Sequence, residues 1–583
     1  MVGNTQKKIK TFSNSIAVGS TITFLLSFLI RYLMLCGNLI MRIQYDDMGM
    51  LVYPAFLSGY KWGEIASYCD YYGGGYYILY TPLLKFIDSP TLIWELIIFG
   101  HILLISLGCA VSYYAAVRYL NFKKSFLTVV QCIGSSVIIV TYSSMSNEPM
   151  LFLLTWLIDL VLMSWEKENK QSRKVFKVIV LVLLSGYSLT VHTRALVFAV
   201  AIVLVIIKKT IEQKKINAII SILTFLILFT VAYFLWNYAK GIVTGNLYMK
   251  GEAKVNNTSL IVGSAPFSKL FSINGIRAII DILFGNIWMI ASQTGGIIYF
   301  SVILAFIYLI RFMKKQSKGD GGDISFWFSL LCFLLGLGGL AVTYARYTMD
   351  SYSELSSMYE SKGFFYLRYY STFCGPLILT TLGGIVREEK DRKKTGIISL
   401  AMASFVFFYL ICVVFPVLGG VENINGGSMH YISSDMNTGY ANYKIAFILQ
   451  IIVIALLCFS KKKYIAELLI IFMFVKPWFL INNGLVINVC LNDKADASLN
   501  YYNEYRDEWL ADVDGYYVPT ATLGRVYQYY LKKETIHVGY PENEGNWVVF
   551  TNSPDDSNLQ KLGYSALYLD SNEYIWTKEM KNK

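Results

Sequence analysis

The chain has 583 residues, of which 55% are hydrophobic, 16% are aromatic and only 15% are charged. Soluble domains carry about 25% charged residues, so this composition excludes a disordered chain, a secreted disulfide scaffold and a single soluble globule. The net charge is +12. Because the basic residues gather in short connections between apolar runs, this charge does not indicate a nucleic-acid partner. We therefore expect lipid to surround most of the chain.

Thirteen apolar runs are candidate membrane spans, because a helix that crosses a bilayer needs about 20 predominantly apolar residues. The first run is too long for a signal peptide and no cleavage site follows it, so we expect it to be retained as an anchor. The fifth and sixth runs are too short to cross alone, and we expect a broken pair around 191–194. The runs cover 15–40, 92–117, 125–142, 149–164, 177–190, 195–208, 216–238, 284–310, 325–345, 366–386, 395–417, 443–460 and 464–482.

Basic residues gather in every second connection between these runs. About half of the 51 lysines and arginines lie in the N-terminal tail and in six short connections, a distribution typical of cytoplasmic loops. The pattern predicts a multi-pass protein of the cell membrane, with a cytoplasmic N-terminus and the C-terminus outside. The connections are 118–124, 167–174, 208–215, 311–318, 387–394 and 461–463.

The outer segments are long, whereas the inner connections are short and charged. Loops on a rigid scaffold usually carry the functional site, so we expect the site at the outer face. The long outer segments are 41–91, 239–283, 346–365 and 418–442.

The chain changes character near residue 483, where the long apolar runs end. Residues 498–513 and 520–533 have helical spacing, and 554–563 fits a crossover helix. Three short runs rich in β-branched and aromatic residues indicate strands. We therefore predict a transmembrane domain over 1–483 and a small soluble α/β domain outside the membrane over 484–583. The three strand-like runs are 535–540, 546–551 and 565–570.

An acidic pair, Asp46 and Asp47, follows the first run. Acids at membrane depth are costly and indicate function, although these two could also be solvated residues at the end of a helix. One carboxylate of such a pair can take a proton from a hydroxyl group as a general base, while its neighbour adjusts the pKa.

Tyrosines surround three consecutive glycines in the outer segment 41–91. They fit an interfacial aromatic belt, and they also fit a pocket in which aromatic rings stack on sugars while glycine lets the backbone approach. The glycines lack the lysine and hydroxyl residue of a P-loop. Tyr72, Tyr76 and Tyr77 are the candidates for sugar binding.

Charged residues also lie at the outer ends of later runs. Glu148 is part of an Asn-Glu-Pro turn, which either only begins a helix or places Glu148 at the outer face with the site, as a candidate for substrate binding. His192 and Arg194 lie on the outer side, where the charge rule predicts no cation, so Arg194 needs an anionic partner such as an outer acid or a lipid phosphate. Arg368 opens the tenth run, where it either snorkels or adds a second cation for phosphate.

No spacing of residues indicates a metal centre or a nucleotide site. The nine cysteines form no CxxC pair, and HExxH, GxSxG and dinucleotide fingerprints are absent. We therefore predict no metal ligands and no defined cofactor, with a divalent cation left open. Only Cys69 and Cys490 are expected outside, and sequence alone does not decide whether they pair.

In order and spacing, the stretches YDDMGM, SNEP, VHTRAL and FYLRYYSTFCGP resemble bacterial GT-C-fold glycosyltransferases, related to the protein mannosyltransferase and aminoarabinose transferase groups. The resemblance covers about residues 15–390. It implies an all-α polytopic fold of about 13 transmembrane helices, followed here by the C-terminal α/β domain. Leu367 stands where related sequences often have glycine.

The resemblance also implies an activity. Such enzymes move a sugar from a polyprenyl-phosphate carrier to a cell-envelope glycan, lipid or protein on the outer face. It implies Asp46 as the general base, with Arg194, and also His192 and Arg368, near the carrier phosphate. A single displacement at the anomeric carbon would invert its configuration.

Two other classes of function compete with this interpretation. A transporter or flippase of lipid-linked sugars would also need outer cations and a tyrosine-lined cavity, but the sequence has no inverted repeat. A structural or assembly protein would leave the acidic pair and the His-x-Arg turn unexplained. We therefore expect a glycosyltransferase.

Overall fold

The computed structural model describes most of the chain. The described residues are 15–35, 43, 45–69, 71–139, 146–213, 216–247, 270–313, 321–348, 367–387, 392–418, 439–459, 465–473, 475, 513–542, 545–553, 555–569 and 573–578.

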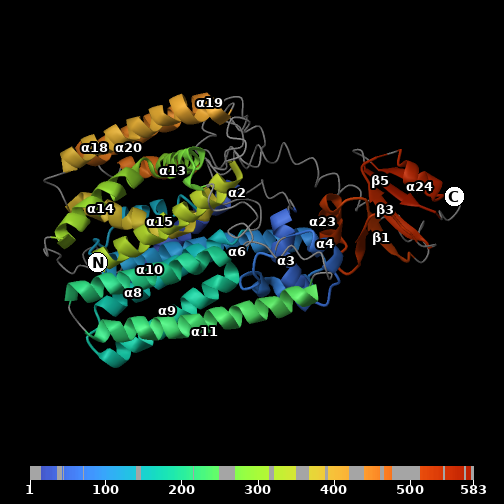
Figure 1. Cartoon of the computed structure of the whole chain (residues 1–583), viewed down its shortest axis with the longest axis horizontal. Coiled ribbons are helices and arrows are strands. Elements are labelled where there is room, and N and C mark those ends of the chain that lie inside the picture. The colour runs from blue at the N-terminus through green and yellow to red at the C-terminus, as the bar shows by residue number, and fades with distance from the viewer. Residues whose placement is uncertain are drawn as a thin grey trace, which may run out of the picture.

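Long apolar helices build the larger part of the molecule, where they lie side by side as a bundle (Figure 1). Within the described ranges, nine of them have the length and composition to cross a membrane. The protein is therefore a multi-pass membrane protein. The nine are α2 (Ile16–Leu35), α6 (Pro90–Arg118), α8 (Glu148–Glu166), α9 (Gln171–Val191), α11 (Ile216–Leu247), α13 (Ile273–Thr294), α15 (Gly321–Thr348), α18 (Arg392–Tyr409) and α20 (Gly439–Phe459).

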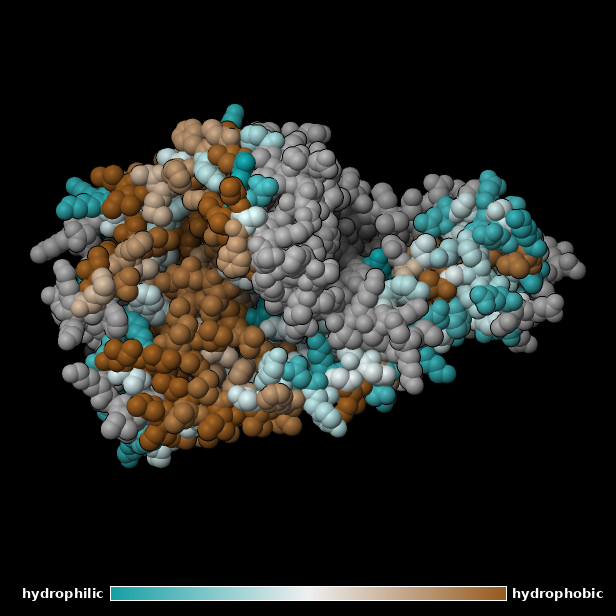
Figure 2. Space-filling view, viewed as in Figure 1, coloured by the Kyte–Doolittle hydropathy of each residue, from teal (hydrophilic) through white to brown (hydrophobic). Residues whose placement is uncertain are grey.

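Shorter helices complete the bundle. They are α7 (Phe126–Gly134), α10 (Leu196–Gln213), α14 (Ile297–Met313), α17 (Cys374–Arg387) and α19 (Phe415–Leu418). A π-helical turn, Leu410–Val414, joins α18 to α19. Apolar side chains point outward from the bundle, as Leu223, Ile227 and Phe234 do on α11. The hydrophobic surface accordingly gathers over the bundle, whereas the end of the molecule that carries the C-terminal sheet is mostly hydrophilic (Figure 2).

Several expected spans differ from the observed helices. In the run 125–142 the described α-helix covers only Phe126–Gly134, and the run 366–386 opens with 3-10 turns before α17. The run 464–482 is described only over 465–473 and at 475. The run 284–310 is divided, because Gly295 and Gly296 follow α13 with φ angles of 61° and 82°. These angles favour glycine, and a left-handed glycine is a common way to end a helix. The expectation that the fifth run is too short to cross alone was wrong, since α9 has 21 residues and is one of the nine spans.

The C-terminal region forms a mixed sheet with strand order β2-β1-β3-β5-β4. Strand β1 is parallel to β2 and β3, and β5 is antiparallel to β3 and β4. Helix α23 (Ala521–Tyr530) joins β1 to β2, and its Tyr527 stacks on Phe550 with ring centroids 4.1 Å apart. The strands are β1 (Gly515–Val518), β2 (Ile536–Val538), β3 (Trp547–Thr551), β4 (Ser565–Leu569) and β5 (Glu573–Thr577).

These elements confirm the small C-terminal sheet region. The predicted strands correspond to β2, β3 and β4, and the predicted crossover helix corresponds to α24 (Ser557–Lys561). Strands β1 and β5 were not predicted, although at four and five residues they are no shorter than β2, which was predicted. All but the last residue of the predicted helix 498–513 lies outside the described residues, as does Cys490.

The first outer segment lies between the bundle and the sheet (Figure 1). The Trp62 indole N–H donates to the Lys532 carbonyl (2.9 Å), and the Tyr529 hydroxyl donates to the Pro90 carbonyl (3.0 Å). The sheet region is therefore hydrogen-bonded to the segment that carries the acidic pair. The elements of this segment are α3 (Tyr45–Leu57), α4 (Gly63–Ser67), the 3-10 turn η1 (Tyr77–Tyr80) and α5 (Thr81–Phe86).

Candidate active site

Helix α3 places the two acids in different surroundings. Both lie in its first turn, where the positive end of the helix dipole favours carboxylates. The Asp46 side chain is 32% exposed and its Oδ1 accepts a hydrogen bond from the Tyr72 hydroxyl (2.8 Å). Asp47 is buried, with 1% exposure, and its charge acts on Tyr77 and Tyr529, whose pKa values are raised by burial and also by this carboxylate.

The three glycines of the first outer segment pack against the end of α9. The Gly75 N–H donates to the Thr190 carbonyl (2.9 Å), and Gly73 has a φ of +90°. A Cβ atom at Gly73 would overlap the Thr190 backbone, and one at Gly75 would overlap its side chain. Glycine is therefore needed here, because the turn closely approaches the backbone of α9. The contact between the turn and α9 brings Tyr72 beside His192, with ring centroids 6.2 Å apart.

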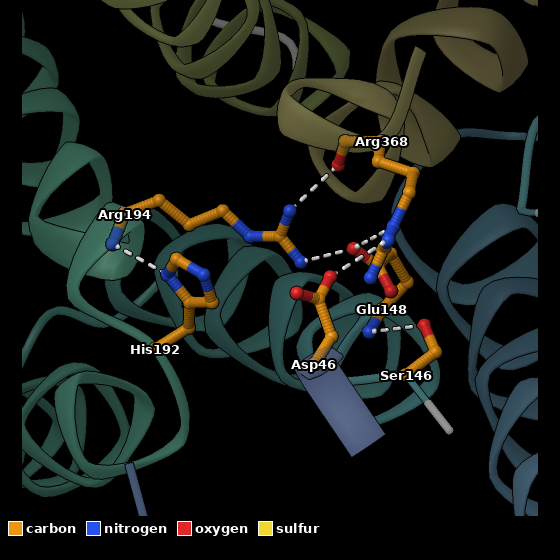
Figure 3. A network of polar contacts seen from close by, with 6 residues as sticks. All are labelled: Asp46, Ser146, Glu148, His192, Arg194 and Arg368. Carbon is orange, nitrogen blue, oxygen red and sulfur yellow. Dashed lines mark hydrogen bonds and ion pairs between the residues drawn. The ribbon is translucent and has the colours of Figure 1, made fainter. Parts of the chain in front are cut away.

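Glu148 connects two arginines from distant parts of the chain (Figure 3). It is the first residue of α8, and its backbone N–H donates to the Ser146 hydroxyl (3.2 Å). Its Oε1 accepts from Nη2 of Arg194 (2.6 Å) and from Nε of Arg368 (3.4 Å). Nη1 of Arg194 also donates to the Arg368 carbonyl (2.8 Å), so the two arginines are held as one unit.

Arg368 extends this network to Asp46. It lies in the 3-10 turn η5 (Leu367–Tyr369), and its Nη1 lies 3.5 Å from Oδ2 of Asp46. Its side chain is 20% exposed, compared with 10% for Arg194. Arg368 is thus the more accessible cation of the pair.

His192 is expected to be a neutral ring within this network. Its Nδ1 accepts a hydrogen bond from the Arg194 backbone N–H (3.1 Å), which assigns the proton of the neutral ring to Nε2. Burial lowers the pKa of His192 well below its usual value, and the neighbouring Arg194 charge acts in the same direction. The ring therefore holds the 3-10 turn η2 (Thr193–Ala195) that carries Arg194.

These side chains meet at a small cavity of about 40 Å³. Six residues predicted from the sequence lie on its wall: Asp46, Tyr72, Glu148, His192, Arg194 and Arg368. Asp47, Tyr76 and Tyr77 do not line it; the hydroxyl group of Tyr76 is instead hydrogen-bonded to that of Tyr80 (2.6 Å).

Sequence reasoning did not select Asn147, Met50 or Tyr369, which also line the cavity. The Asn-Glu-Pro turn could have indicated Asn147, and the Arg-Tyr pair at 368–369 could have indicated Tyr369. In the structure the Arg194 guanidinium lies 6.0 Å from the Tyr369 ring centroid.

A second cavity, of about 330 Å³, lies between α3, α4 and the end of α11. Its wall includes Phe56, Tyr60, Lys61 and Asn246, and no described residue there is acidic. The smaller cavity is the better candidate for catalysis, because acids and cations converge on it. The described residues contain no group of three or more His, Cys, Asp or Glu side chains that could hold a metal ion.

The sequence matches no protein-family model and no curated protein. The structure is similar to the crystal structure of ArnT from Cupriavidus metallidurans bound to undecaprenyl phosphate, with a TM-score of 0.51 and 11% sequence identity. That similarity covers 96% of this chain and 98% of ArnT. The crystal structure of ArnT in the apo state has a TM-score of 0.49 and 10% sequence identity, and the similarity covers 97% of this chain and 98% of that one. The chain thus has the fold of ArnT, an aminoarabinose transferase of the GT-C fold, which confirms the fold expected from the sequence.

Proposed function

We propose that this protein is a membrane glycosyltransferase that moves a sugar from a polyprenyl-phosphate carrier to an acceptor of the cell envelope. The observation that carries the proposal is the cavity on which Asp46, Glu148, Arg194 and Arg368 converge, in a chain with the fold of ArnT. The ArnT structure of the same fold holds undecaprenyl phosphate. A fold alone does not define an activity, so the proposal depends on the chemistry of these side chains.

Asp46 is proposed as the general base. Its carboxylate is partly exposed, and Tyr72 orients it through Oδ1. The acceptor hydroxyl would transfer its proton to Asp46 while its oxygen attacks the anomeric carbon of the sugar. The bond from that carbon to the carrier phosphate breaks in the same step, the electron pair leaves with the phosphate, and the configuration inverts.

The arginines are proposed to stabilise the leaving phosphate. Arg368 has the more exposed side chain, at 20% against 10% for Arg194, so a phosphate could approach it more easily. Arg194 donates hydrogen bonds to the Glu148 carboxylate and to the Arg368 backbone carbonyl. We therefore assign phosphate contact chiefly to Arg368, and assign Arg194, Glu148 and His192 to positioning it.

The proposed reaction takes place at the outer face of the membrane. The alternating basic connections support a cytoplasmic N-terminus and an outer position of the segment 41–91. On the same grounds we propose that 484–583 is a soluble domain outside the membrane. Tyr76 and Tyr77 would then support the segment rather than contact the sugar directly.

The test is sugar transfer by the purified full-length protein. Labelled polyprenyl-phosphate sugars are supplied with a cell-envelope fraction, and the product is quantified for the wild type and for Asp46→Asn. We expect the wild type to transfer one of the sugars and Asp46→Asn to be at least about 100-fold slower, because it lacks the base. An unchanged rate in a folded Asp46→Asn protein, or translocation of the carrier without transfer, would contradict the proposal.

A further inference from the structure

Four buried polar atoms around the small cavity have no hydrogen-bond partner among the described residues. They are Oδ1 and Nδ2 of Asn147, Oε2 of Glu148 and Nε of Arg194. Buried polar groups are nearly always hydrogen-bonded, and leaving one without a partner destabilises the folded state. Four such atoms on adjoining side chains indicate that a ligand or ordered water completes the network.

Asn147 is the most informative of these residues. It occupies the position just before α8, where an asparagine side chain usually accepts a hydrogen bond from the first turn of the helix. Here its side chain makes no such bond. The residue is 1% exposed and lines the cavity, so its amide is buried without serving the helix.

The chemistry of the four atoms distinguishes between possible ligands. Oδ1 of Asn147 and Oε2 of Glu148 are acceptors, whereas Nδ2 of Asn147 and Nε of Arg194 are donors. Phosphate oxygens accept hydrogen bonds, so the two acceptor atoms would repel them. A hydroxyl group both donates and accepts, and neighbouring hydroxyls of a sugar can therefore pair with donors and acceptors together.

We infer that Asn147, together with Oε2 of Glu148, binds hydroxyl groups of the sugar carried on polyprenyl phosphate. This inference rests on the proposed function and deepens it by assigning a sugar subsite. Arg368 contacts Glu148 through Nε and Asp46 through Nη1, so it lies between the two acids (Figure 3). The sugar hydroxyls would thus lie on the Glu148 side of Arg368, and the anomeric carbon with its phosphate on the Asp46 side.

The test compares the bare carrier with carriers that bear a sugar. Affinities for bare undecaprenyl phosphate and for undecaprenyl phosphate carrying glucose, galactose, mannose or N-acetylglucosamine are measured with the purified full-length protein in nanodiscs. The wild type is expected to bind one sugar-bearing carrier more tightly than the bare carrier. Asn147→Ala is expected to weaken binding of that carrier by about three- to tenfold, as for one lost neutral hydrogen bond, without changing the affinity for bare carrier. Asn147→Asp keeps the shape of the side chain but loses its N–H donors, so it is also expected to weaken binding of the sugar-bearing carrier.

Asn286 provides a matched control. It is also a buried asparagine, but its amide donates to the Ile282 carbonyl and its Oδ1 accepts from the Tyr370 hydroxyl. Asn286→Ala is expected to lower the melting temperature without changing the ratio of the two affinities. Asn147→Ala should change that ratio without lowering the melting temperature, because no hydrogen bond within the protein is lost.

The other outcomes overturn the inference. If Asn147→Ala lowers the affinities for the bare and the sugar-bearing carrier equally, the amide of Asn147 contacts the phosphate or the lipid. If neither affinity changes, the partner of the amide is water. If the wild type binds every sugar-bearing carrier no better than the bare one, the inference fails while carrier binding stands; if it binds no carrier at all, the proposed function fails too.

Discussion

At the scale of single residues, one oxygen of Glu148 organises the site. Oε1 accepts from two guanidinium groups, and the side chain is only 3% exposed. Removing one partner of such a buried group leaves a charge without compensation, which typically costs about 3–5 kcal/mol. The two arginines share this carboxylate but differ in exposure, so their substitution should have different consequences.

We predict that Arg194→Ala and Arg368→Ala separate stability from transfer. Arg194→Ala removes the 2.6 Å ion pair with Glu148 and the bond to the Arg368 backbone, so its melting temperature should fall by several degrees. Arg368→Ala should unfold closer to the wild-type temperature but transfer sugar about 100-fold more slowly, because the leaving phosphate loses its accessible cation. Thermal unfolding and transfer kinetics on both variants test this, and equal effects of the two substitutions would contradict it.

At the scale of elements, the position of α3 depends on the turn that contains the three glycines 73–75, which belongs to the same outer segment. The glycine turn rests on the end of α9, and Tyr72 beside it is hydrogen-bonded to Asp46. The same contact lies next to His192, which follows α9. A disturbance at the glycines should therefore reach both the proposed base and the Arg194 turn.

We predict that Gly73→Ala impairs the site without touching a charged residue. Its φ of +90° strains an alanine, and the new Cβ would overlap the Thr190 backbone. We expect transfer to fall by about tenfold or more, with a lower melting temperature. Gly59→Ala is the matched control, because Gly59 has a similar φ of +88° but open space around its Cβ position. Equal activity losses in the two variants would show that backbone strain, not the contact with α9, is responsible.

At the scale of the whole molecule, the C-terminal sheet is tied to the segment that carries the acids. The Glu64 carboxylate of α4 accepts from the Val538 backbone N–H (2.7 Å) and lies 2.7 Å from Nδ1 of His537 on β2. Tyr529 of α23 is buried within the electrostatic influence of Asp47 on α3. The sheet thus contacts α3 and α4 on the side away from the bundle (Figure 1).

We predict that Glu64→Ala loosens the sheet from the first outer segment. Amide hydrogen exchange should become faster in β2 and α4, and transfer should fall moderately because α3 loses support on one side. Asp88→Ala is the control, since Asp88 is an exposed partner of Lys533, and exposed ion pairs contribute little. Unchanged exchange in Glu64→Ala would show that the other hydrogen bonds of this contact hold the sheet without Glu64.

Features that depend on local composition could be predicted from the sequence. Apolar runs predicted the membrane helices and short β-branched runs predicted three strands, because lipid burial and strand pairing favour residues that are recognisable within a short window. It also selected six residues of the cavity wall: Tyr72 from the tyrosines around three glycines, and the other five because an ionisable side chain beside a membrane span is costly enough to stand out.

How those residues meet could not be predicted, because it depends on the packing of the whole chain. Asp46 and Asp47 are adjacent in sequence, yet packing turns one to the cavity and buries the other, since neighbouring side chains on a helix point in different directions. Glu148 meets partners 46 and 220 residues away, and Trp62 meets one 470 residues away. Such pairings result from the packing of helices that are far apart in the chain, and no local pattern encodes them. The break at Gly295 and Gly296 likewise became visible only in the structure, as did the Asn147 amide, which has no hydrogen-bond partner among the described residues.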